Sequence, residues 1–161
     1  MRLFVAIQLS DELKTTLTGT MHELKKAGVK GNYVPVKNLH LTLAFIGETT
    51  ETARIREALQ LVSFKPCRLS LTEMGTFDDL LYVGMKGNQG IASIVKSVRD
   101  ALDSIGVRYD RKKFVPHITI IRKAAGNWKS VPAPKGDMTV TKISLMKSEE
   151  KNGKRVYTEI R

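Results

Sequence analysis

Apolar and polar residues alternate over several stretches of the chain, which is typical of half-buried strands. In the clearest stretch, at positions 38–47, every second residue is apolar: Leu39, Leu41, Leu43 and Phe45. We therefore expect Phe45 to lie in the core. Similar patterns predict strands at residues 3–9, 68–73, 80–85, 139–146 and 155–160, and around His117.

Apolar residues at helical spacing predict three helices between these strands. Ser10 can cap the first helix and Gly28 can end it. Thr49 or Thr50 can cap the second, and Gly106 closes the third. The chain is thus predicted to mix strands and helices throughout.

A shift of 77 positions superimposes the two halves of this pattern. It places "HLTL" on "HITI", so that His40 falls on His117 and Thr42 falls on Thr119. The strand and helix before the first motif also fall on a strand and helix before the second. The sequence therefore predicts two similar lobes related by a pseudo-two-fold axis.

The length of 161 residues, 42% of them hydrophobic, suits a single domain over residues 1–161. No stretch approaches the ~20 apolar residues of a membrane span, so we expect no membrane contact and a cytoplasmic monomer. Cys67 is the one cysteine, which excludes a disulfide or a Cys-based zinc site within one chain. Asn152-Gly153 predicts a tight hairpin turn between the last two strands.

The charge balance indicates what kind of partner the protein binds. Lys and Arg number 27 against 16 Asp and Glu, which gives a net charge of +11. Such a charge favours polyanions, above all nucleic acid. Solubility explains the charge equally well, so the charge alone does not identify a partner.

Two matched histidines facing each other across a cleft suit concerted proton transfer. An unperturbed imidazole pKa near ~6.5 makes the neutral and the charged form available near neutral pH. Thr42 and Thr119 can hydrogen-bond an anion held between the rings of His40 and His117. A single His-x-Thr motif is more often an ordinary half-buried position. The two copies in register favour a phosphodiester site.

Other chemistries find less support in the sequence. No Cys cluster, HExxH motif or spaced carboxylate supplies a third ligand beside the two histidines, so we expect no metal. The glycines of Gly84–Gly90 match neither the dinucleotide nor the Walker spacing, so we expect a strand-to-helix turn and no cofactor. No G-x-S-x-G elbow indicates a serine nucleophile.

Basic and aromatic residues near the motifs are candidates for substrate contacts. Arg122 lies five positions after His117, so on a regular strand it faces away from the histidine unless the strand bends or ends. Tyr33 and Phe114 lie in the approaches to the two strands and can stack a base, as single-stranded RNA readers do.

The stretches "NLHLTLAFIG" and "FVPHITIIR" resemble the two signatures of the 2H phosphoesterase superfamily. Within it the chain is most similar to the RNA 2′,3′-cyclic phosphodiesterases, also known as 2′-5′ RNA ligases. The likeness extends from the "RLFVAI" start through both motifs to the terminal hairpin. It implies a bilobal α+β fold in which antiparallel sheets line a central cleft.

The resemblance also implies an activity, namely metal-independent hydrolysis of an RNA terminal 2′,3′-cyclic phosphate to a 2′-phosphate. It gives His40 the role of acid and His117 that of base, and it makes Thr42 and Thr119 phosphate ligands. Arg122 matches the arginine that commonly follows the second motif. An RNA 5′-hydroxyl in place of water would give 2′-5′ ligation.

Two alternatives remain open at this point. The protein could be a basic RNA-binding module without turnover, given its +11 charge and its aromatic residues. It could also be a 2H phosphodiesterase that acts on a small cyclic nucleotide or a 2′-5′ oligoadenylate. The near symmetry of the two motifs leaves the order of acid and base open as well.

Overall fold

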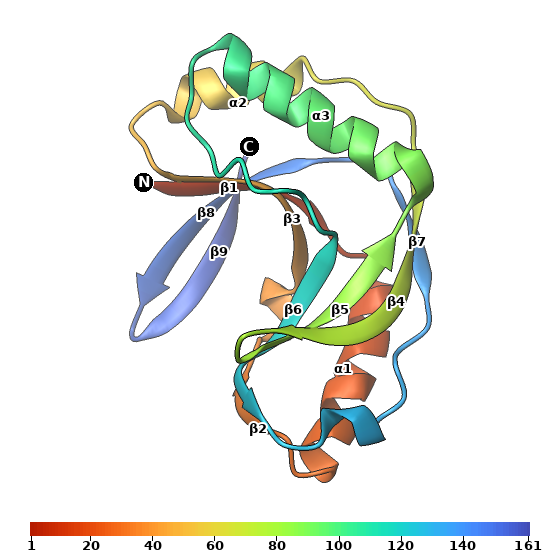
Figure 1. Ribbon diagram of the computed structural model, residues 1–161. Coiled ribbons are helices and arrows are strands. Elements are labelled where there is room, and N and C mark those ends of the chain that lie inside the picture. The colour runs from red at the N-terminus through yellow and green to blue at the C-terminus, as the bar shows by residue number, and fades with distance from the viewer.

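The protein is represented by a computed structural model, which describes the backbone of residues 1–161 and every side chain except that of Asn88. The fold is α+β and is built on two antiparallel sheets, as the sequence predicted (Figure 1). The first sheet has the strand order β3-β1-β8-β9, with β1 Arg2–Gln8, β3 His40–Glu48, β8 Ser144–Lys151 and β9 Lys154–Ile160. The second has the order β2-β6-β5-β4-β7, with β2 Lys30–Tyr33, β4 Cys67–Phe77, β5 Leu80–Lys86, β6 His117–Ala125 and β7 Asp137–Val140.

The predicted repeat is visible in the connections between these strands. In the first half, β1 leads into helix α1, Asp11–Lys26, and β3 returns antiparallel beside β1. In the second half, β5 leads into helix α3, Asn88–Ser104, and β6 returns antiparallel beside β5. The two strands that carry the His-x-Thr motifs, β3 and β6, contact each other where the sheets meet.

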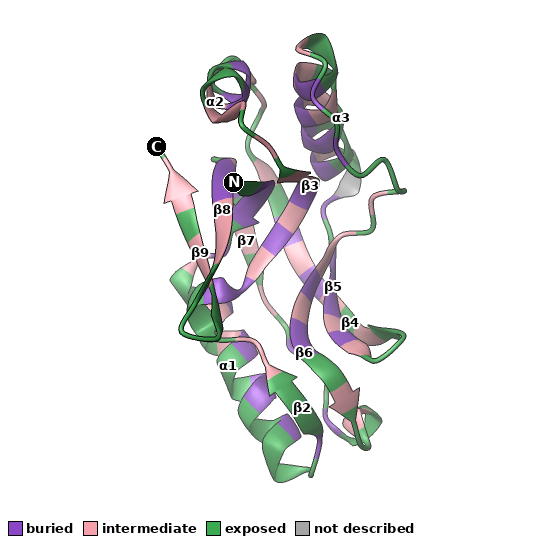
Figure 2. Ribbon diagram, turned by 90° about the vertical axis from the view of Figure 1, so that its left-hand side faces the viewer, coloured by how far each residue is buried: buried purple, intermediate pink, exposed green. Residues whose placement is uncertain are grey.

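The helices lie at opposite ends of the molecule. Helix α1 is at one end, and α3 packs against α2, Thr52–Gln60, at the other (Figure 1). The hydroxyl of Ser10 accepts a hydrogen bond from the backbone N–H of Leu13 at 3.2 Å, which makes Ser10 the predicted cap of α1. The buried residues of the helices form stripes, as Figure 2 shows.

The predicted cap of α2 and the last predicted strand but one were wrong. Neither Thr49 nor Thr50 caps α2, because the hydroxyl of Thr49 accepts from the N–H of Glu51 in the turn before the helix. The strand predicted at residues 139–146 is two strands in different sheets, since β7 ends at Val140 and β8 begins at Ser144. No Gly or Pro marks the crossing from one sheet to the other, so the crossing could not be predicted from turn-forming residues.

The core follows the alternation of β3 and β6. Leu41 and Leu43 on β3 are at most 2% exposed, and Ile118 and Ile120 on β6 are fully buried. These apolar side chains occupy one face of each strand, so the intervening polar side chains are on the opposite face. None of the described helices is long and apolar enough to cross a membrane.

A β-bulge interrupts this alternation at the same place in each half. In β3, Ala44 pairs with Val5 and Thr42 pairs with Ala6, so Leu43 is an extra residue without a partner. In β6, Ile120 is the extra residue, between the partners of Leu81 and Tyr82. Each bulge buries two consecutive residues and reverses which side of the sheet the following residues face.

Candidate active site

A cleft of about 860 Å³ lies between the two sheets and brings both motifs together. His40 and Thr42 of β3 line it from one side, and His117 and Thr119 of β6 line it from the other. The spatial arrangement expected from the paired motifs is therefore present. Arg122 lines the same cleft.

The bulge in β6 explains how Arg122 reaches the cleft. On a regular strand, a residue five positions after His117 would face the opposite side of the sheet. The extra residue Ile120 shifts the alternation by one position, so that Arg122 is exposed on the same side as His117. The sequence left open whether Arg122 faces the same side of the sheet as His117 or the opposite side. The bulge in β6 places it on the side of His117.

His40 is the more confined of the two imidazoles. Its Nδ1 lies 2.7 Å from the backbone oxygen of Asn38, and its Nε2 lies 2.8 Å from the hydroxyl of Thr42. Because a carbonyl oxygen only accepts, Nδ1 carries the hydrogen, and in the neutral ring Nε2 accepts from Thr42. This tautomer leaves the lone pair of Nε2 on the side of Thr42.

Burial lowers the pKa of His40 below its ordinary value of 6.5, because desolvation penalises the imidazolium. The hydrogen bond to the oxygen of Asn38 opposes this shift. The positive charges of Arg122 and His117, on the opposing strand, lower the pKa further. The environment therefore favours a neutral His40 that is able to accept a proton.

His117 occupies an equivalent but more open position. Its Nδ1 lies 2.6 Å from the backbone oxygen of Val115, two residues earlier, as in the first motif. Among the described residues, no protein group hydrogen-bonds its Nε2. That nitrogen is available to a ligand in the cleft.

Two aromatic rings pack against each imidazole. Phe4 and Tyr157 lie 4.9 and 5.2 Å from His40 between ring centroids, and Tyr157 meets it edge to face. Phe77 and Tyr82 lie 5.3 and 5.5 Å from His117, and they stack on each other. The rings come from other strands of the same sheet as their histidine, and their packing restricts how each imidazole can rotate.

The two predicted stacking residues lie in different surroundings. Tyr33 lines the cleft, its hydroxyl donates to the backbone oxygen of Val29 at 2.6 Å, and Lys25 lies 5.0 Å from its ring centroid. Phe114 is partly buried against the core and is not among the residues that line the cleft. Only Tyr33 is therefore placed to meet a ligand.

With this geometry established, the chain can be compared with known proteins. Residues 4–152 match the 2′-5′ RNA ligase superfamily. The chain belongs to this superfamily. The resemblance to the 2H phosphoesterases that the two motifs indicated is thereby confirmed.

Individual members of the superfamily align over most of the chain. An RNA 2′,3′-cyclic phosphodiesterase of Archaeoglobus fulgidus is 35% identical over 130 residues, which is 76% of this chain and 72% of that protein. One of Escherichia coli K12 is 29% identical over 99% of this chain and 94% of that protein. The crystal structure of E. coli LigT complexed with 3′-AMP superimposes with a TM-score of 0.85 at 27% identity, covering 99% of this chain and 95% of that one.

Within this superfamily fold, Asn38 is a site residue that sequence reasoning missed. Its side chain is 5% exposed, and its Nδ2 donates to the backbone oxygen of Arg155 on β9 at 3.0 Å. Its own backbone oxygen accepts from His40. Asn38 thus fixes His40 and joins it to the hairpin β8–β9, which projects from one side of the molecule (Figure 1).

The hairpin supplies more of the cleft lining, as Ser148, Glu150, Gly153 and Arg155. Asn152 and Gly153 have φ angles of 52° and 76°, which fits the predicted type I′ turn. With Arg2, Arg122 and Lys123, Arg155 outweighs the carboxylate of Glu150, so the charged part of the lining is mainly cationic. Such a lining suits a phosphate-bearing ligand.

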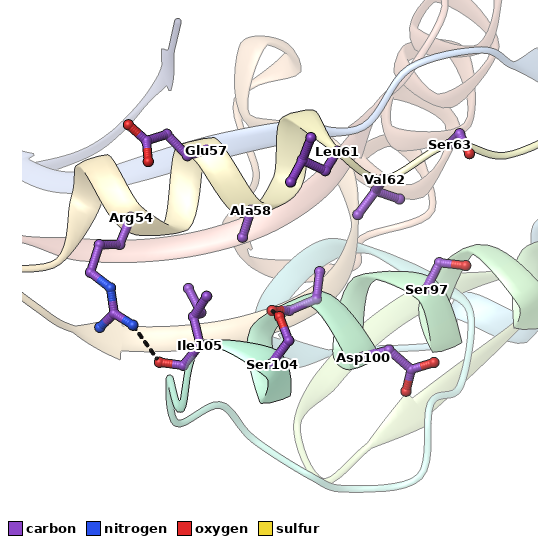
Figure 3. Close-up of a pocket in the computed structure, with 11 residues that line it drawn as sticks. Arg54, Glu57, Ala58, Leu61, Val62, Ser63, Ser97, Asp100, Ser104 and Ile105 are labelled. Atoms are coloured by element: carbon purple, nitrogen blue, oxygen red, sulfur yellow. Dashed lines mark hydrogen bonds between the residues drawn. The ribbon is translucent and has the colours of Figure 1, made fainter.

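A smaller hollow of about 580 Å³ lies away from this cleft, between α2 and α3 (Figure 3). The guanidinium of Arg54 donates to the backbone oxygen of Ile105 across it at 2.9 Å. The residues of the two motifs line the cleft between the sheets and not this hollow, so we assign the site to the cleft. Among the described residues, no group of three or more His, Cys, Asp and Glu side chains is arranged to hold a metal ion.

Proposed function

We propose that the protein hydrolyses the terminal 2′,3′-cyclic phosphate of RNA to a 2′-phosphate, with His40 and His117 as an acid–base pair. The observation that carries this proposal is the convergence of the two His-x-Thr motifs on one cationic cleft. The names of the relatives from Archaeoglobus fulgidus and Escherichia coli, both RNA 2′,3′-cyclic phosphodiesterases, support it. So does the membership of the chain in their superfamily.

In the proposed mechanism, the cyclic phosphate lies between the two imidazoles. His40 rests neutral and accepts a proton from the water that attacks phosphorus. His117 donates a proton to the departing ribose 3′ oxygen. This order inverts the one expected from the family resemblance, and the lowered pKa of His40 favours it.

The remaining groups act on the phosphoryl oxygens. Thr42 and Thr119 donate hydrogen bonds to these oxygens, and Arg122 balances the charge that builds up on them. Before substrate binds, the hydroxyl of Thr42 donates to Nε2 of His40 at 2.8 Å, so on binding it turns to a phosphoryl oxygen and frees Nε2 to take the proton. An RNA 5′-hydroxyl that attacks phosphorus in place of water, with the ribose 3′ oxygen departing as before, forms a 2′-5′ linkage.

One chain carries both halves of the site, which supports action as a monomer. The proposed partner is RNA that ends in a 2′,3′-cyclic phosphate or contains a 2′-5′ linkage, and the cationic lining suits its backbone. A cytoplasmic location stays a prediction.

The proposal is tested by incubating the protein with a short RNA that ends in a 2′,3′-cyclic phosphate, in the presence of a chelator. We expect a 2′-phosphate as the sole product and a rate that the chelator does not change. A 3′-phosphate product, or no turnover, contradicts the proposal. Salt-dependent binding without turnover would instead indicate an RNA-binding module, and faster turnover of a small cyclic nucleotide or a 2′-5′ oligoadenylate would indicate a smaller substrate.

The order of acid and base can be tested with a pH profile. In the variant His117→Ala, the residual kcat/KM should fall on acidification as His40 gains a proton, and this should occur below pH 6.5 because burial lowers the pKa of His40. Titration of the His40 ring by NMR gives the same pKa independently. A residual activity that instead falls as the pH rises through that pKa would make His40 the acid.

A further inference from the structure

Lys123 lines the cleft, and the proposed mechanism gives it no task. On a regular strand, consecutive side chains point to opposite faces of the sheet, so Lys123 would face away from the cleft if Arg122 faces into it. Both residues nevertheless line the cleft. The chain therefore departs from strand geometry at Lys123, and it presents two consecutive cations to a ligand.

The backbone of Lys123 shows this departure directly. Its φ angle is 53°, which is in the left-handed region. Of the described residues other than glycine, Asp78 and Asn152 also have a positive φ angle, 52° in each. Aspartate and asparagine tolerate this conformation because their short side chains can hydrogen-bond locally, whereas the Cβ of a lysine crowds the following carbonyl oxygen. The conformation of Lys123 is thus unfavourable for its residue type.

Neighbouring strands hold the backbone in this conformation. Strand β2 lies beside β6 (Figure 1), and its register leaves Gly31 opposite two residues, Lys123 and Ala124. A Cβ on Gly31 would lie 2.9 Å from the backbone oxygen of Lys123, so the close approach of the strands requires glycine. The N–H of Ala124 donates to the backbone oxygen of Asp79 at 2.7 Å. The strained residue is therefore fixed from both sides.

Other departures from strand alternation also bring side chains into the cleft. The bulges at Leu43 and Ile120 turn the residues that follow them. As a result Phe45, which was expected in the core, is 39% exposed and lines the cleft, as Arg122 does. Backbone strain clusters at binding and active sites, where the surrounding structure enforces it. Lys123 is accordingly a candidate for a ligand contact.

The ammonium group of Lys123 is available to a ligand. Its side chain is exposed, and none of the ion pairs found among the described side chains includes it. Arg155, another cation of the lining, donates to the hydroxyl of Ser148 at 3.3 Å. An ammonium group binds phosphate as a compact point charge. An anionic phosphate oxygen is therefore the ligand that suits Lys123.

The position of Lys123 along β6 indicates which phosphate it meets. Lys123 lies four residues beyond Thr119, about 12 Å along the strand. The lysine side chain covers part of this distance, and the rest is similar to the spacing of neighbouring phosphates along an RNA strand. A cyclic phosphate held between His40 and His117 thus leaves the next phosphate of the same strand within reach of Lys123.

We propose that Lys123 binds the phosphodiester on the 5′ side of the terminal nucleotide, the next phosphate after the cyclic one. The proposal rests on the proposed function, because it takes the cyclic phosphate to lie between His40 and His117. A mononucleoside cyclic phosphate lacks this phosphodiester. The contact therefore makes the site select RNA over a small cyclic nucleotide.

The test compares two adenosine dinucleotides that end in a 2′,3′-cyclic phosphate and differ only in the internal linkage, a phosphodiester or an uncharged methylphosphonate. For the wild-type protein, kcat/KM should be about three- to tenfold higher for the phosphodiester. The difference should lie in KM, because the contact is remote from the reacting phosphorus and is the same in ground and transition state. Lys123→Met should remove most of this difference, and Lys123→Arg should keep it.

Two further variants separate the contact from overall charge and from folding. Lys65 is exposed in the loop before β4 and is not among the residues that line the cleft, so Lys65→Met removes the same charge elsewhere. Lys65→Met should keep the wild-type difference between the dinucleotides. Lys123→Gly removes the side chain together with the strain, so it should lose the difference and yet unfold at a temperature no lower than that of the wild type.

The outcomes separate this proposal from the proposed function. A difference that survives in Lys123→Met, or no difference in the wild type, overturns the contact while turnover upholds the phosphodiesterase. If the wild-type protein turns over neither dinucleotide, the proposed function fails. The affinities of wild type and Lys123→Met for the two dinucleotides, measured by isothermal titration calorimetry, then decide whether Lys123 binds the phosphodiester.

Discussion

His40→Ala and His117→Ala should each lower kcat/KM for RNA with a terminal 2′,3′-cyclic phosphate by about 10²–10⁴, the range for loss of a general acid or base. Both imidazoles line the same cleft, so neither can substitute for the other if they act on opposite sides of one phosphorus. The double variant should be little slower than the slower single one, because groups that act in one concerted step are not additive. Steady-state kinetics measure all three.

His22 provides a matched control for these variants. It is the third histidine of the chain and is exposed on α1, away from the residues that line the cleft. His22→Ala should retain the wild-type rate. Thermal unfolding of each variant shows whether it is folded. Wild-type activity in either cleft variant would exclude the acid–base pair.

The sequence predicted the strands that carry the site because their apolar faces are strongly periodic. Leu41 and Ile118 are buried in a shared core, so the alternation around His40 and His117 had a physical cause. The internal repeat predicted that the two histidines face each other across one cleft. For this part of the site, local pattern and tertiary structure agree.

The residues beyond the bulges could not be placed in this way. Period two holds only while each residue has one partner across the ladder, and the extra residues Leu43 and Ile120 break it. For this reason Phe45 was wrongly expected in the core and the side of Arg122 stayed open. The pair of consecutive apolar residues in each motif, Leu43-Ala44 and Ile120-Ile121, was the available signal.

Contacts between side chains on different strands of a sheet could not be predicted from the sequence either. The rings beside His40 come from β1 and β9, and those beside His117 come from β4 and β5. The link from Asn38 to Arg155 joins residues more than a hundred positions apart. Such contacts depend on strand order, which the periodicity of single strands does not encode.

Arg122→Met should lower kcat/KM for cyclic-phosphate RNA by about 10²–10³, the cost of removing one group that stabilises charge in a transition state. The same variant should raise the pKa of His40, since the positive charge of Arg122 is one of the causes that lower it. A raised pKa moves the loss of activity on acidification to higher pH if His40 is the base. Kinetics and NMR titration of His40 measure the two effects separately.

Arg122→Lys and Arg108→Met separate the possible causes of this loss. Lysine keeps the charge but lacks the planar fork of the guanidinium, so Arg122→Lys should keep the pKa of His40 low and recover only part of the rate. Arg108 is exposed in the loop after α3, and Arg108→Met removes the same net charge elsewhere. If Arg108→Met slowed the reaction as much as Arg122→Met, the effect would come from overall charge and RNA attraction. A loss confined to Arg122 means that the bulge in β6 positions this side chain for the phosphoryl group itself.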